Sequence, residues 1–102
     1  MNKHRVLVSP AANDRMHDHF LFLAQVSEKA ARNLLAQLVK DIKSLENMPQ
    51  RNPYFDRPYL EQGKYRYMLS YRRYRIVYQI ARDCVFIEDI QDCRQDNDKN
   101  LL

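Results

Sequence analysis

The sequence predicts an α+β domain in which a helical hairpin packs on one face of a mainly antiparallel four-stranded sheet, in the order β-α-α-β-β-β. Two observations lead to this prediction. Hydrophobic residues recur every three or four positions between residues 12 and 45, and every two positions after Gly63. The chain has 102 residues, of which 45% are hydrophobic, enough for one core. We therefore expect a single domain over residues 1–102, with a polar, frayed tail at 92–102.

The first strand and the first helix are expected close together. The apolar run inside residues 5–8 predicts a short strand. Ser9 and Pro10 then mark a helix start, because a serine hydroxyl caps free N–H groups and proline suits the first turn. The helix is expected over residues 10–25, and its apolar stripe consists of Ala12, Met16, Phe20 and Leu23.

Ser27 opens the second helix, which Pro49 ends. Its apolar stripe consists of Ala31, Leu34, Leu35, Leu38, Ile42 and Leu45. Only one or two residues separate the two helices, which predicts an antiparallel hairpin. Three prolines and the single glycine then fall within residues 47–63, together with aromatic side chains. This composition predicts an ordered crossing loop.

Three strands follow the loop in an antiparallel meander, with short links at residues 72–73 and 82–83. Alternation predicts that one set of side chains faces the helices: Tyr65, Tyr67, Leu69, Ile76, Tyr78 and Ile80. Arg66 and Arg75 then share the opposite, open face. Of the tyrosines, Tyr67 and Tyr78 are expected in the core, whereas Tyr71 and Tyr74 at the hairpin end are candidate contacts.

Charge is segregated along the chain. Residues 64–82 contain six basic side chains and no acid, whereas residues 83–98 contain six acids and one base. Arginine suits forked contacts with phosphate, so the open face is a candidate anion site. The ordinary alternative is a solvated polar sheet face.

Other kinds of site are disfavoured by the sequence. Cys84 and Cys93 lack metal-ligand or redox spacing and are expected to be free thiols in a reducing compartment. The histidines form no ligand cluster, so we expect neither a metal nor another cofactor. No apolar run is long enough for a membrane span. We expect a cytoplasmic protein.

The segment KYRYMLSYRRYRIVYQIARDCVFIEDIQDCRQD resembles the C-terminal sheet of RelE/ParE-type toxins of bacterial toxin–antitoxin modules. The closest elements are the run Tyr74-Arg75-Ile76-Val77-Tyr78 and the Arg-x-Asp element at residues 94–96. The resemblance implies a toxin neutralised by a cognate antitoxin. Its default activity would be ribosome-dependent, metal-independent mRNA cleavage. The alternatives are ParE-like inhibition of DNA gyrase and a non-toxic binding module with the toxin fold.

The resemblance also assigns candidate roles. Arg66, Arg75 and Arg94 would be the catalytic, phosphate-stabilising residues. Candidate contacts to nucleic acid or antitoxin are Lys64, Tyr71, Arg72, Arg73, Tyr74 and Asp96. The family's second lysine is replaced by Met68, a histidine by Cys93 or Asp92, and the tyrosine after Arg94 is absent. An acidic antitoxin segment is expected to lie across Arg66 and Arg75.

Overall fold

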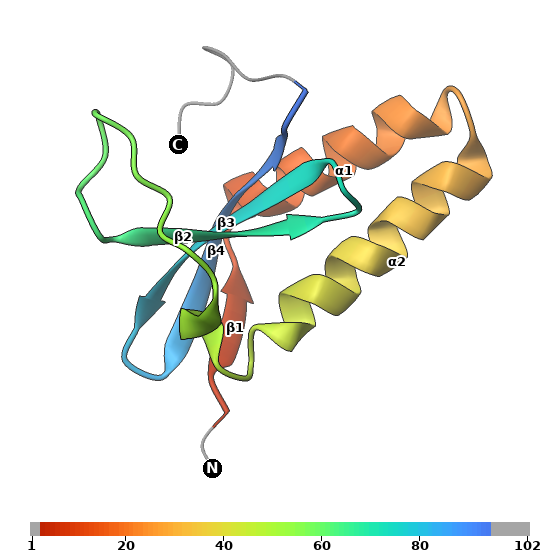
Figure 1. Ribbon diagram of the computed structural model, residues 1–102. Helices are drawn as coiled ribbons and strands as arrows, with labels where there is room; N and C mark the ends of the chain where they lie inside the picture. Colours follow the sequence, from red (N-terminus) through yellow and green to blue (C-terminus); the bar gives the residue numbers. More distant parts are fainter. Residues whose placement is uncertain (1–2, 95–102) are drawn as a thin grey trace.

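The computed structural model describes residues 3–94 as two helices packed on one four-stranded sheet (Figure 1). The elements are β1 (Arg5–Val8), α1 (Pro10–Ala24), α2 (Glu28–Ser44), the 3-10 helix η1 (Pro49–Arg51), β2 (Tyr65–Ser70), β3 (Tyr74–Ala81) and β4 (Cys84–Asp92). The strand order is β1-β4-β3-β2. β1 runs parallel to β4, and the other neighbours are antiparallel. The predicted fold class is confirmed.

Both helices begin where the serine caps were expected. The Ser9 hydroxyl accepts a hydrogen bond from the Ala12 N–H at 3.0 Å, and Ser27 accepts one from the Ala30 N–H at 3.1 Å. Each bond satisfies an N–H group that has no partner inside its helix. The caps therefore fix where the two helices start, and the hairpin covers one face of the sheet (Figure 1).

The core lies between the helical hairpin and the sheet. Its buried side chains are Ala12, Leu34, Leu38, Ile42, Leu45, Tyr74, Ile76, Tyr78, Val85, Ile87 and Ile90. Most of the core residues that come from the helical hairpin belong to the predicted apolar stripe of α2. Removing this apolar surface from water is the main stabilising contribution to the fold.

α1 covers the part of β4 that β1 leaves unpaired. β1 pairs only with residues 84–87, so the outer edge of β4 is open beyond Ile87. There His19 Nε2 lies 2.7 Å from the Ile90 carbonyl oxygen. Because a carbonyl can only accept, this nitrogen carries the proton and donates it. A side chain of α1 thus replaces a strand in satisfying the sheet edge.

The crossing segment between α2 and β2 is ordered, as expected. The Phe55 N–H donates to the Tyr65 carbonyl at 2.7 Å, and the Tyr67 N–H donates to the Pro53 carbonyl at 3.1 Å. These bonds make a one-residue bridge alongside β2. The segment runs along the free edge of β2 (Figure 1). Its first part lies near the core, where the Tyr78 hydroxyl donates to the Pro49 carbonyl at 2.6 Å, and the Phe55 side chain that follows is 2% exposed.

Three predicted boundaries need correction. α1 ends at Ala24, one residue early, and α2 ends at Ser44, before the proline. Asp92 was assigned to the polar tail, but it is the last residue of β4 and is 3% exposed. The rest of the expected tail, residues 95–102, lies outside the described residues. None of the helices between residues 3 and 94 is long and apolar enough to cross a bilayer.

Candidate functional site

Arg66 and Arg75 lie on opposite faces of the sheet, which corrects the prediction that they share one. Residues directly opposite each other in neighbouring strands point to the same side. Arg66 is opposite Tyr78, a core residue, and Arg75 is opposite Leu69 on the open face. Tyr65, Tyr67 and Leu69 therefore lie on the open face as well, contrary to prediction.

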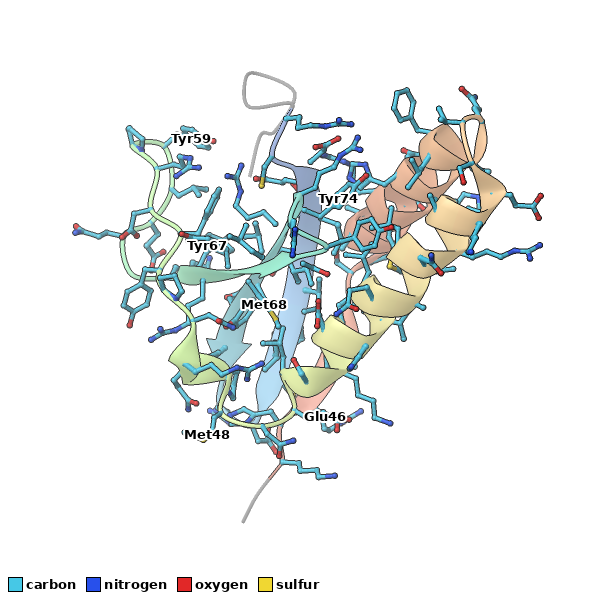
Figure 2. All side chains as sticks on the ribbon, turned by 45° about the vertical axis from the view of Figure 1, so that its right-hand side comes forward. Glu46, Met48, Tyr59, Tyr67, Met68 and Tyr74 are labelled. Carbon is cyan, nitrogen blue, oxygen red and sulfur yellow. The ribbon has the colours of Figure 1, made fainter. Side chains whose placement is uncertain are left out.

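The register of β2 is the physical reason for this difference. Met68, opposite Ile76, is the residue of β2 that packs against the core. Its sulfur lies 3.9 Å from the Ser44 hydroxyl on α2. Tyr67 is half-buried on the other face, beside the crossing segment, while Tyr74 lies on the helix side (Figure 2). The prediction of a core position is confirmed for Tyr78 and wrong for Tyr67.

Arg66 is bonded to the backbone of the crossing segment. Its Nη1 donates to the carbonyls of Gln50 at 3.1 Å and Asn52 at 2.6 Å. Its guanidinium also stacks 4.0 Å from the ring centroid of Tyr54. The side chain therefore fastens this segment to β2, and its donors are directed at the chain's own carbonyls.

Arg75 belongs to a polar row that crosses the sheet. Its Nε and Nη2 both donate to Gln91 Oε1, at 3.1 and 2.9 Å. The Gln91 amide donates in turn to Asp89 Oδ2 at 3.1 Å. Asp89 pairs with Arg15 of α1 at 3.4 Å. Sequence reasoning missed these partners, because the β3–β4 register places Gln91 opposite Arg75 and the packing of α1 brings Arg15 to Asp89.

Two arginines contact one aromatic ring on the open face. The Arg57 guanidinium lies 4.1 Å from the Phe55 ring centroid, and that of Arg75 lies 5.3 Å from it. The edge of Tyr67 contacts the same ring, with centroids 6.0 Å apart. Phe55 thus covers part of the open face that the sequence suggested was a bare arginine surface.

Arg73 and Arg94 gather around one buried carboxylate. Arg73 donates to both oxygens of Asp92, with its Nη2 at 2.8 Å from Oδ2. The Arg94 N–H donates to Oδ1 at 2.9 Å, and its Nε lies 3.8 Å away. Burial alone would raise the pKa of Asp92, but hydrogen bonds from Arg73 and the Arg94 backbone outweigh it and hold this pKa below the ordinary value.

The two tyrosines at the hairpin end have different environments. Tyr74 is 1% exposed and packs against His19, with ring centroids 4.9 Å apart. Burial raises the pKa of its hydroxyl. The prediction of Tyr74 as a surface contact is therefore wrong. Tyr71 is 39% exposed in the turn between β2 and β3, beside the exposed Arg72.

The remaining candidates do not complete a single centre. Lys64 is exposed, with its ammonium 5.3 Å from the Tyr65 ring centroid. Asp96 lies outside the described residues. The three expected catalytic arginines are thus divided between the helix side, the open face and the end of β4. Between residues 3 and 94, no group of three His, Cys, Asp or Glu side chains is placed to hold a metal ion. Both cysteines are free thiols.

Comparisons with known proteins bear on the fold and the family. A search of the curated proteins gives no match. Among solved structures, the chain is similar to one titled "Chromosomal ParDE TA system from P. aeruginosa". The TM-score is 0.70 and the identity 13%, over 88% of this chain and 96% of that one. The family described as "ParE toxin of type II toxin-antitoxin system, parDE" matches residues 6–97. Because this match spans most of the sequence, the chain belongs to the ParE toxin family.

Proposed function

We propose that this protein is the toxin of a toxin–antitoxin pair and that it acts by inhibiting DNA gyrase, without cutting mRNA. The family match supports the toxin role, and ParE-like members are the gyrase-directed branch of the superfamily that the sequence resembles. The observation that carries the choice between targets is the placement of the arginines. Arg66 and Arg75 lie on opposite faces.

Metal-independent RNA cleavage needs several groups aimed at one phosphate. Basic side chains must stabilise the charge on its oxygens, while others accept and supply protons. Here Arg66 is directed at backbone carbonyls and Arg75 at Gln91. At the position of the family's second lysine, Met68 packs against the core. This arrangement favours inhibition by binding over phosphodiester chemistry.

A cognate antitoxin is the expected partner. An acidic segment lying along the open face would meet Arg57 and Arg75, which both contact the Phe55 ring. It would not reach Arg66, whose guanidinium is on the other side of the sheet. The site of neutralisation proposed from the sequence is thereby restricted to the open-face cations.

Two assays on the purified protein test the proposed target. In the first, the protein is added to DNA gyrase and relaxed plasmid with no ribosome present, and supercoiling is expected to stop. In the second, it is added to a reconstituted translation reaction, and primer extension on the mRNA is expected to show no new 5′ ends. Cleaved mRNA together with unimpaired supercoiling would overturn the proposal.

Arg75→Gln sharpens the comparison. A nuclease that uses Arg75 to stabilise phosphate charge would lose roughly 100-fold or more of its cleavage rate. A gyrase inhibitor that uses Arg75 only to hold Gln91 should keep its potency. Circular dichroism must first show that the variant is folded.

A further inference from the structure

The turn between β2 and β3 has a backbone that its residues disfavour. Tyr71 and Arg72 have φ angles of 54° and 59°, and the Arg73 N–H donates to the Ser70 carbonyl at 3.2 Å. Two consecutive residues at positive φ within a hydrogen-bonded turn form a type I′ turn, for which Asn-Gly is the usual sequence. A tyrosine and an arginine in these positions are strained.

Neither of these two side chains is buried in the fold. Tyr71 is 39% exposed, and Arg72 is exposed and makes no hydrogen bond or ion pair with any residue between 3 and 94. Together with Gln37 of α2 they line an open depression of about 330 Å³. The turn points toward α2 (Figure 1). Backbone strain of this kind is often found at residues that take part in binding or catalysis.

A second turn in the chain provides an internal comparison. Arg82, between β3 and β4, also has a positive φ, at 58°, and is also exposed. It lies at the opposite end of β3, its neighbour in the turn is Asp83, and the described depression does not include it. The pairing of an aromatic side chain with an arginine beside a depression distinguishes the turn at Tyr71.

The charge around this turn indicates the kind of partner. Arg73 is paired with Asp92 at 2.8 Å, and Arg94 lies 3.8 Å from the same carboxylate. Of these three arginines, Arg72 is the one that has no carboxylate partner between residues 3 and 94. A nucleic-acid surface usually presents several cations to successive phosphates. Tyrosine and arginine, in contrast, are the residues most often responsible for affinity in protein–protein interfaces. The turn therefore fits a protein that offers a carboxylate to Arg72 and an apolar group to the depression.

We propose that the Tyr71–Arg72 turn is the contact through which this protein binds an acidic surface of DNA gyrase. This inference rests on the proposed function and names the part of the chain that carries it. The turn replaces the open-face arginines as the target-binding element and leaves that face available to the antitoxin.

The test compares Arg72→Gly with Arg82→Gly in the supercoiling assay. Both substitutions remove one exposed arginine at positive φ, so they make the same change in charge and relieve the same kind of strain. Both variants should melt at or above the temperature of the unmodified protein. Only Arg72→Gly should raise the concentration needed for half-inhibition, by roughly tenfold or more. Tyr71→Asn should do the same, since asparagine accepts this backbone.

The outcomes separate the two proposals. If the unmodified protein does not inhibit gyrase, the proposed function fails and this inference fails with it. If it inhibits gyrase and Arg72→Gly inhibits equally well, the inference alone is overturned. A gel-shift measurement with duplex DNA but no gyrase gives the third outcome. If Arg72→Gly loses affinity for DNA and Arg82→Gly does not, the turn binds nucleic acid and the inference is wrong.

Discussion

His19 fixes the position of α1 through one hydrogen bond and one ring contact. Its Nε2 donates to the Ile90 carbonyl, and its ring packs against Tyr74. The sequence signal was present but ambiguous, because positions 12, 16, 19 and 23 fit a helical stripe as well as 12, 16, 20 and 23 do. The hydrophobicity of Phe20 favoured the wrong position. Position 19 is the buried one, and its polar side chain suits the site because the Ile90 carbonyl of β4 needs a donor there.

This histidine predicts a pH-dependent stability. Burial lowers the pKa of His19 below its ordinary value, despite the opposing effects of the Ile90 carbonyl, Asp92 and Asp89. Arg15 also lowers it, and Tyr74 is the other titratable group in contact. In the unfolded chain, the His19 imidazole takes up a proton near pH 6.5, whereas in the folded protein it stays neutral at that pH. The free energy of unfolding therefore falls as the pH drops from about 7 to 5.

Chemical denaturation at several pH values measures this effect against His19→Gln, which can still donate to the carbonyl but does not titrate. As the pH drops, the free energy of unfolding of the unmodified protein should fall more steeply than that of His19→Gln, with a difference in slope of up to about 1.4 kcal/mol per pH unit. Parallel curves for the two proteins across this window would contradict the assignment.

At the scale of the elements, the sequence predicted which segments form helices and strands but not which face β2 presents. Periodicity placed β1 correctly and β2, β3 and β4 to within two residues. In β2, one alternating set is Tyr65, Tyr67 and Leu69, and the other is Arg66, Met68 and Ser70. The first set is more apolar, yet it lies on the open face, where Tyr67 packs against Phe55 of the crossing segment. That long-range contact has no local signal.

The role of Arg66 predicts a local opening when it is removed. Arg66→Ala deletes two charged hydrogen bonds to the crossing segment, at a cost of about 1–2 kcal/mol. Trypsin should then cleave faster after Arg51, which is followed by Asn52. Arg72→Ala is the control, because it removes an exposed arginine without such bonds. Equal cleavage rates in the two variants, measured by mass spectrometry, would mean that Arg66 does not hold this segment.

For the whole molecule, folding gives several side chains of the basic and acidic stretches partners inside the chain. The basic stretch and the acidic stretch form neighbouring strands, so Arg73 meets Asp92, and Gln79 donates to Glu88. Of the six basic residues between 64 and 82, Arg66, Arg73 and Arg75 are bonded within the chain. The sequence could show that charges were segregated, but not that strand pairing would bring them together.

Weak binding to DNA follows from the spacing of the exposed arginines at the two ends of β3. Arg72 and Arg82 lie at opposite ends of β3, too far apart to form one continuous phosphate-binding surface. In gel-shift titrations at several salt concentrations, log affinity for duplex DNA should fall against log salt with a slope of only about −1 to −3. A slope steeper than about −5 would indicate a continuous cationic surface and contradict this reading.

The position of β4 has a consequence for how the protein is made. This strand lies between β1 and β3, yet it is the last of the four in the chain. A growing polypeptide that has not yet added residues 84–92 has no central strand to join β1 to the β2–β3 hairpin. Its helices then display an apolar stripe that lacks Val85, Ile87 and Ile90 of the core. We therefore expect a chain without β4 to be prone to aggregation until this strand inserts.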